Sequence, residues 1–251
     1  MKFSLKSLSA LVLSVAALST ASVSFADTVV LFAGPAYSGS NSNPYQYGQG
    51  GEFTAVTSNG IPAGYSSLAR FTNANGITGF ETFCVEGGTN DVYFTPGVTY
   101  TYTTSSQVLG GPQGALPLTV GTAWLYSQFA TGQLTGYYGA SNRNALAGQL
   151  QNAFWTLENE SNAAIAGWIQ TLLTGQFGAS STIADWTAAA GANNFGVQVM
   201  NLWTSSTSNV AAQNQLIYNG RPVPDGGLTI LLLGVSFLGL ALFKRHFAKQ
   251  V

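Results

Sequence analysis

Cys84 is the only cysteine in the 251-residue chain, and its thiol is the side chain best suited to chemistry. It lies in the segment GFETFCVEGG, at residues 79–88. A thiolate is a nucleophile and a soft metal ligand, but one thiol alone forms neither an internal disulfide nor a zinc site. Two interpretations remain open at this point. Cys84 acts as a nucleophile, or it is a small buried hydrophobic residue, as many single cysteines are.

The inventory of other reactive side chains excludes most enzyme classes. The only histidine, His246, lies beyond a C-terminal apolar segment and cannot assist a nucleophile in the body of the chain. Histidine and cysteine are too few for a zinc site, and no Gly-rich phosphate loop is present. Glu158 and Glu160 are too close in sequence to indicate a glycosidase pair. We therefore expect no enzymatic turnover, no metal and no cofactor.

The elements around Cys84 predict a β-rich first half. Segments such as DTVVLFAG, GEFTAV, GITGFETFCVE and GVTYTYTT are rich in β-branched and aromatic residues, and Gly- and Asn-rich turns separate them. Cys84 falls at the end of one of these strands. The segment AQNQLIY near residue 215 predicts a returning strand, and NNFGVQVMNLWTS fits a short helix or a strand.

The middle of the chain predicts helices inserted between the strands. The strongest candidate is SNRNALAGQLQNAFWTLENES, with an apolar stripe at Leu146, Leu150, Ala153 and Leu157. This phasing places Arg143 and Glu158 toward solvent. The fold class predicted for residues 27–222 is α+β, with a sandwich-like β-rich half and an inserted helical subdomain.

Two short motifs together resemble those of thioester domains in bacterial surface adhesins. Gln151, followed by Ala153, Phe154 and Trp155 in LQNAFWTLE, is similar to the glutamine motif of that family. Cys84, preceded by Phe83 and followed by an aliphatic residue, is similar to its cysteine motif. The resemblance implies a bond between the Cys84 sulfur and the Gln151 side-chain carbonyl, formed with loss of ammonia.

The chemistry of such a bond explains the residue types. A thiolate is the nucleophile, and the amide of glutamine, unlike a carboxylate, can lose ammonia to give the thioester. Water destroys a reactive acyl group, so apolar walls should surround the bond. Phe80, Phe83, Phe154 and Trp155 are the expected walls.

The N-terminus predicts export. Residues 1–26 combine Lys2 and Lys6, an apolar run from residue 8 to residue 18, and a small-x-small site that ends at Ala26. These three parts are typical of a secretory signal peptide, and the apolar run is too short for a permanent membrane span.

The C-terminus predicts a membrane helix within residues 223–251. Residues 228–243 are 16 residues without a charge, a helix of about 24 Å, and Lys244, Arg245 and Lys249 follow. Basic residues directly after an apolar helix hold that end in the cytoplasm.

The same tail resembles a VPDSG-CTERM or PEP-CTERM sorting signal. Val223, Pro224, Asp225, Gly226 and Gly227 form the motif, and the apolar helix and basic cluster follow it in the order of that family. The resemblance implies cleavage near the motif by an exosortase-type membrane protease and transfer to the cell surface or extracellular matrix.

The composition of the body favours extracellular partners other than nucleic acid. Residues 27–222 contain eight carboxyl side chains and three arginines, so no basic patch is available for phosphates. The prediction is a sorted surface or matrix protein that attaches covalently to amines through the thioester, for example on a surface or an extracellular polysaccharide. The alternative is a structural or glycan-associated matrix protein with an inert buried Cys84, in which exposed tyrosines of NPYQYGQ and TGYYGAS contact sugar.

Overall fold

The computed structural model of the chain describes residues 27–34, 43–47, 50–87, 93–109, 114–204 and 211–220. The expected signal peptide (1–26), the sorting motif (223–227), the apolar helix and the basic residues Lys244, Arg245 and Lys249 lie outside these ranges.

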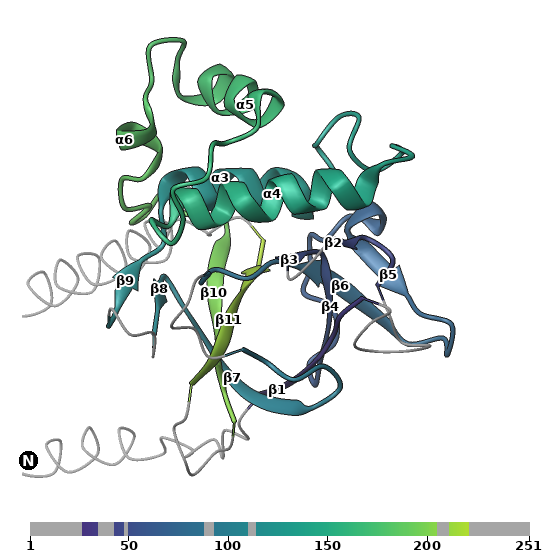
Figure 1. The fold of residues 1–251 in the computed structure, drawn as a ribbon. Coiled ribbons are helices and arrows are strands. Elements are labelled where there is room, and N and C mark those ends of the chain that lie inside the picture. The colour runs from purple at the N-terminus through teal and green to yellow at the C-terminus, as the bar shows by residue number, and fades with distance from the viewer. Residues whose placement is uncertain are drawn as a thin grey trace, which may run out of the picture.

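Most strands belong to one antiparallel sheet of seven strands, in the order β11-β10-β7-β1-β4-β6-β5 (Figure 1). Its members are β1 (Asp27–Phe32), β4 (Phe53–Thr57), β5 (Arg70–Thr72), β6 (Thr78–Thr82), β7 (Thr99–Ser105), β10 (Val197–Trp203) and β11 (Ala211–Tyr218). Two small ribbons accompany it: β2 (Gln46–Tyr47) with β3 (Gly50–Gly51), and β8 (Gln107–Val108) with β9 (Leu116–Pro117). The predicted strands near residues 27, 53, 78, 99 and 215 are confirmed. The segment NNFGVQVMNLWTS, which fits either a helix or a strand from its sequence, contains strand β10.

The sheet curls until its two sides meet, which differs from the expected sandwich of two facing sheets. The chain just beyond β6 pairs with β11, because Leu216 N–H donates to the Phe83 carbonyl (3.0 Å) and Val85 N–H donates to the Asn214 carbonyl (3.0 Å). Because the sheet is twisted, the free hydrogen-bonding groups of its edge strand β11 can pair with the chain beyond β6. The closure brings Cys84 opposite Gln215.

The helices follow the sheet strands β1 to β7 and precede β10, as the inserted helical subdomain requires. They are α3 (Val120–Ala130), α4 (Arg143–Leu157), α5 (Gly167–Phe177) and α6 (Ile183–Trp186), and a short 3₁₀ turn, η3 (Ser67–Ala69), precedes β5. Figure 1 shows α3 and α4 side by side across one side of the curled sheet.

Helix α4 packs its apolar stripe as expected but buries more polar groups than expected. Leu150, Ala153 and Leu157 have no exposed surface, whereas Leu146 is only partly buried. The predicted orientation of Arg143 and Glu158 toward solvent is wrong, because both are about nine-tenths buried at the two ends of the helix. Their charges are accommodated by partners that come from distant segments.

The core is built around aromatic rings between α3, α4 and the sheet. The ring centroids of Phe83 and Phe154 lie 5.1 Å apart, and those of Phe83 and Phe129 lie 5.0 Å apart. Edge-to-face pairs of this kind contribute beyond the area they bury. The aromatic core therefore holds α4 firmly against the segment that carries Cys84.

Candidate functional site

Gln151 and Cys84 meet in the interior of the protein although 67 positions separate them in the sequence. The Cys84 N–H donates to Gln151 Oε1 (3.0 Å), and Gln151 Nε2 donates to the Cys84 carbonyl oxygen (2.7 Å). Both residues are fully buried. One edge of the Cys84 backbone faces β11, and the Gln151 carboxamide occupies the other edge as a neighbouring strand would.

The Cys84 thiol belongs to a small apolar cluster apart from the main core. It packs with Ala33 and Phe53, and the partly buried rings of Phe94 and Trp155 cover this cluster. The sulfur also accepts a hydrogen bond from Gln215 Nε2, at 3.2 Å. The site is therefore apolar, with carboxamide groups placed at the sulfur and the backbone.

Of the four expected walls, only Trp155 packs on this cluster. Phe80, Phe83 and Phe154 belong to the main core instead. Phe83 and Cys84 are neighbours on an extended segment, and successive side chains of such a segment point to opposite faces. This alternation turns Phe83 toward the helices, where it meets Phe154.

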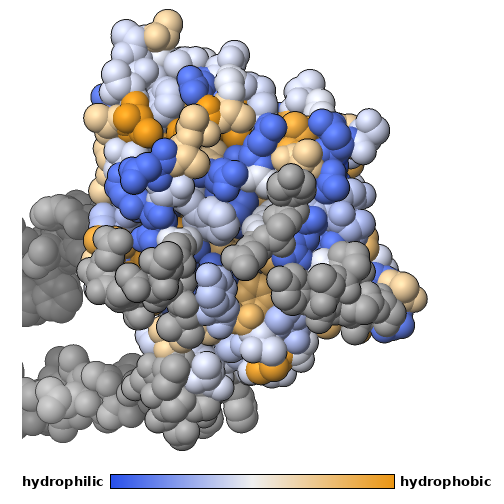
Figure 2. Space-filling model, in the orientation of Figure 1, coloured by the Kyte–Doolittle hydropathy of each residue, from blue (hydrophilic) through white to orange (hydrophobic). Residues whose placement is uncertain are grey.

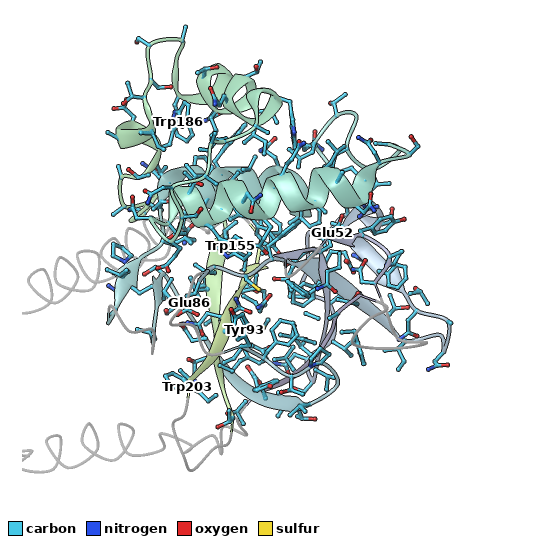
Figure 3. The ribbon with its side chains drawn as sticks, in the orientation of Figure 1. Glu52, Glu86, Tyr93, Trp155, Trp186 and Trp203 are labelled. Atoms are coloured by element: carbon cyan, nitrogen blue, oxygen red, sulfur yellow. The ribbon has the colours of Figure 1, made fainter. Side chains whose placement is uncertain are left out.

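Trp155 fixes the loop that follows Cys84. Its Nε1 donates to the Glu86 carbonyl oxygen (2.8 Å), and its indole lies against Gly87. A Cβ at position 87 would come within 2.6 Å of the indole, so no side chain fits there. Figure 3 shows Trp155 between helix α4 and the sheet, with Glu86 below it. Hydrogen bonds therefore join helix α4 to the segment around Cys84 at two places, from Gln151 to Cys84 and from Trp155 to Glu86.

The ribbon β2–β3 covers Gln151. A Cβ at Gly50 would lie 2.6 Å from Gln151 Cγ and 3.1 Å from the Trp155 ring. Only glycine allows the backbone to approach the glutamine this closely. The ribbon therefore restricts the access of water to the carboxamide from that side.

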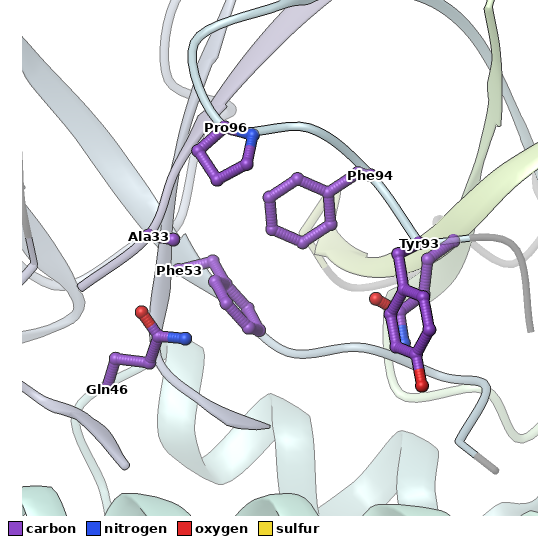
Figure 4. A pocket seen from close by; sticks show the side chains of 7 residues that line it. Ala33, Gln46, Phe53, Tyr93, Phe94 and Pro96 are labelled. Carbon is purple, nitrogen blue, oxygen red and sulfur yellow. The ribbon is translucent and has the colours of Figure 1, made fainter. Parts of the chain in front are cut away.

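A pocket of about 260 Å³ opens next to the thiol cluster (Figure 4). Ala33 and Phe53, which pack on Cys84, form part of its wall. The other lining residues are Gln46, Tyr93, Phe94, Pro96 and Gln213. None of the described residues that line it is charged, so this part of the pocket is suited to a small or slender group that reaches toward the sulfur.

The Cys84 N–H places a hydrogen-bond donor at the carbonyl oxygen of the Gln151 side chain. A backbone N–H that donates to a carbonyl oxygen polarises the carbonyl and stabilises the negative charge that forms when a nucleophile adds. The Cys84 N–H holds this position at Gln151 Oε1. An N–H donor on the sulfur, here from Gln215, favours the thiolate.

The sequence does not reveal the roles of Gln215 and Gly50. The segment AQNQLIY predicts a strand, but no property of it indicates that Gln215 faces Cys84. For Gln151 the sequence does hold a signal of burial, because this polar residue shares a helix face with Ala147 and Phe154. A polar residue within an apolar stripe requires a buried partner.

A second buried polar cluster lies at the other end of α4. Arg143 makes two hydrogen bonds to Glu52, from Nε to Oε1 (2.8 Å) and from a terminal nitrogen to Oε2 (2.7 Å). Tyr137 donates to the same carboxylate (2.8 Å), and the guanidinium lies 3.9 Å from the centre of the Tyr45 ring. Exposed tyrosines in the loops NPYQYGQ and TGYYGAS would favour the glycan alternative; Tyr137 is buried, and Tyr45 is partly buried against Arg143.

Among the residues that Figure 2 colours, the hydrophobic ones on this face form small separate groups among polar ones. The exposed large hydrophobic residues of the described ranges are scattered: Leu68, Ile77, Tyr93, Val98 and Ile183.

The buried carboxyl of Glu81 predicts an unusual pH dependence of stability. It has no exposed surface, and its oxygens pair with Asn43 Nδ2 and with Thr54 Oγ1 (2.9 Å). Burial, and then the nearby charge of Glu52, raise the pKa of Glu81 well above its ordinary value. The unfolded chain therefore loses this proton at a lower pH than the folded protein does.

The free energy of unfolding should fall as pH rises above the ordinary pKa of glutamate, about 4.3. The decline from one proton approaches about 1.4 kcal/mol per pH unit and ends above the folded pKa. Glu81→Gln should reduce this slope and stabilise the protein at neutral pH, as urea denaturation across a pH series can measure. Asp185→Asn is the control and should leave the decline in place, because hydrogen bonds from Thr182 lower the pKa of Asp185 instead of raising it. Equal slopes in Glu81→Gln and the unmodified protein would contradict this prediction.

Comparison with known proteins identifies the tail and leaves the body unmatched. The VPDSG-CTERM motif matches residues 222–247. This match supports the sorting tail, processing by an exosortase membrane enzyme, and export to the cell surface or extracellular space. No curated protein and no solved structure matches the chain, so the resemblance to thioester domains gains no support from these comparisons.

Within the described ranges, no helix has both the length and the apolar character needed to cross a membrane. The same ranges contain no group of three or more histidine, cysteine, aspartate or glutamate side chains placed to hold a metal ion.

Proposed function

We propose that the chain is an exosortase-sorted surface or matrix protein that captures amines covalently through a Cys84–Gln151 thioester. The match of the tail supports the sorting step. One observation supports the covalent step most strongly. The Gln151 carboxamide is hydrogen-bonded at both of its polar atoms to the backbone of the only cysteine, inside a buried apolar site.

Thioester formation is an exchange of one acyl bond for another. The Cys84 sulfur adds to the Gln151 Cδ, and the Cys84 N–H stabilises the resulting oxyanion. The Cδ–Nε2 bond then breaks, and ammonia leaves with the thiol proton. Gln151 Nε2 gives up its hydrogen bond to the Cys84 carbonyl in this step.

Capture reverses the same sequence with a different amine. An external primary amine adds to Cδ, the Cδ–Sγ bond breaks, and a proton from the amine returns to the sulfur. The product is an amide between Gln151 and the partner, with Cys84 restored as a thiol. Each molecule reacts once, so the protein is an attachment device without turnover, and its partner is an amine-bearing surface or extracellular polysaccharide.

Methylamine tests this proposal, because it is small enough to enter the pocket and gives a defined product. Native protein incubated with methylamine should gain methylamine at Gln151, and Cys84 should become reactive toward iodoacetamide at the same rate. Cys84→Ser should show no gain, because an oxygen ester does not form spontaneously from glutamine. The products are identified by mass spectrometry of the peptides that contain residues 84 and 151.

Two controls make the result specific. Gln149, two residues before Gln151 on the exposed face of α4, should gain nothing. Protein unfolded in urea before the amine is added, after complete hydrolysis of the bond, should also gain nothing. Alkylation of Cys84 in the native protein without amine treatment, and no gain at Gln151, would contradict the proposal.

A further inference from the structure

Gln215 faces Cys84 directly across the closure of the sheet. The backbone hydrogen bonds that join the two segments come from their neighbours, Phe83 with Leu216 and Val85 with Asn214. Cys84 and Gln215 are therefore a non-hydrogen-bonded antiparallel pair, whose side chains stand close together on the same face. The pairing gives the Gln215 carboxamide a fixed position beside the sulfur.

The two polar atoms of this carboxamide are in different situations. Nε2 donates to the Cys84 sulfur and to the Gln213 carbonyl oxygen, both at 3.2 Å. Oε1 accepts nothing, and it is the one buried side-chain nitrogen or oxygen without a hydrogen-bond partner among the described residues. Gln215 itself has no exposed surface. Natural proteins rarely leave such an atom unpaired, and an exception calls for an explanation.

The proposed chemistry supplies a partner for this oxygen. Ammonia leaves the Gln151 carbonyl when the thioester forms, and an amine approaches the same carbon when the thioester is consumed. Both carry N–H groups that lose their water on entering an apolar site. An acceptor beside the sulfur can take one of these hydrogen bonds at the moment when water is excluded.

The pocket provides the approach to this position. Ala33 and Phe53 line the pocket and pack on Cys84, and Gln213, whose carbonyl binds Gln215 Nε2, lines it too. An amine that enters this pocket beside Phe53 (Figure 4) comes to the cluster that holds the thiol.

We propose that Gln215 is a positioning residue for both steps, an inference that rests on the proposed thioester. Its Nε2 holds the sulfur and stabilises the thiolate, and its Oε1 accepts a hydrogen bond from the amine that leaves or attacks. No covalent bond forms to Gln215, and the proton passes between sulfur and the amine nitrogen as described above.

The variant Gln215→Leu separates this role from a structural one. Leucine removes the unpaired buried oxygen, a gain that offsets the loss of the two long Nε2 hydrogen bonds, so the urea midpoint should change little. The rate of methylamine uptake should fall about tenfold or more, equivalent to about 1.4 kcal/mol in the barrier. Gln198→Leu, on the neighbouring strand β10, is the matched control and should react at the unmodified rate. A residue that only maintained the fold would lower stability and rate together.

A pH profile tests the contact with sulfur separately. After methylamine capture, the released Cys84 thiol should be alkylated with a midpoint at higher pH in Gln215→Leu than in the unmodified protein. The Nε2 donor that favours the thiolate is then missing. Gln215→Glu should raise the midpoint further, because a carboxylate beside the sulfur repels the thiolate.

The outcomes distinguish the two proposals. If the unmodified protein takes up no methylamine, the thioester and the role of Gln215 are both overturned. If the unmodified protein reacts and Gln215→Leu reacts at the same rate with the same alkylation midpoint, the thioester stands and the inference about Gln215 is wrong. Slower uptake with little change in the urea midpoint and a raised alkylation midpoint supports it.

Discussion

Arg143→Met should lower the free energy of unfolding by about 3–5 kcal/mol, because it leaves the Glu52 carboxylate buried without its counter-ion. Glu52 has no exposed surface, and both of its oxygens bind the guanidinium. Methionine keeps the length of the side chain but restores neither hydrogen bond. Urea denaturation at neutral pH measures the loss.

The loss should depend on pH and on the partner. With Arg143 removed, the pKa of Glu52 rises further, so the destabilisation should shrink as pH falls toward the pKa of an unfolded glutamate. The double variant Glu52→Gln with Arg143→Met should recover part of the loss, because no charge remains unpaired.

Arg70→Met is the control. Arg70 is exposed and has one described hydrogen bond, to the Tyr65 carbonyl, so its loss should be about 1 kcal/mol. Equal losses at positions 70 and 143 would contradict the assignment of Arg143 as a buried counter-ion.

Gln151→Glu should abolish the thioester completely while leaving most of the fold intact. A carboxylate is a poor electrophile and would have to lose hydroxide or oxide, whereas the amide loses ammonia. The substitution preserves the shape of the side chain, and its oxygen can still accept the Cys84 N–H. The other oxygen would face the Cys84 carbonyl, where Nε2 now donates, so a moderate loss of stability is expected.

Gln149→Glu is the matched control, since it makes the same chemical change two residues earlier on the exposed face of α4. It should form the thioester as the unmodified protein does. A thioester in Gln151→Glu, or its absence in both variants but not in the unmodified protein, would contradict the role assigned to Gln151.

The α+β class and most strand positions could be predicted because they depend on local patterns. The alternation in DTVVLFAG and GVTYTYTT and the Leu150–Leu157 stripe each reflect one element and the face it buries. The closure of the sheet could not be predicted in this way. It depends on Phe83 and Val85 pairing with β11, more than 120 positions later, and no local pattern specifies that register.

The candidate site could be predicted only as far as its motifs. Cys84 and Gln151 were paired by resemblance, and the structure places them together. The expected aromatic walls were mostly misplaced, since the alternation of an extended chain separates Phe83 from the thiol. The solvent-facing assignment of Arg143 was wrong for a related reason. Its position fits the buried stripe of Ala147 and Phe154, but its counter-ion, Glu52, lies on a segment that the helical pattern does not contain.

The most direct test of the account is the mass of two tryptic peptides from untreated protein. Trypsin cleaves the body after Arg70 and Arg143 but not after Arg221, which Pro222 follows, so Cys84 and Gln151 fall on different peptides, one of residues 71–143 and one that begins at Asn144. After brief digestion of the denatured protein in mildly acidic buffer, the account predicts one linked species, lighter than the two peptides together by one ammonia. Its hydrolysis should convert Gln151 to glutamate and release the Cys84 thiol. Two separate peptides, with Gln151 an intact glutamine and Cys84 a thiol, would contradict the thioester.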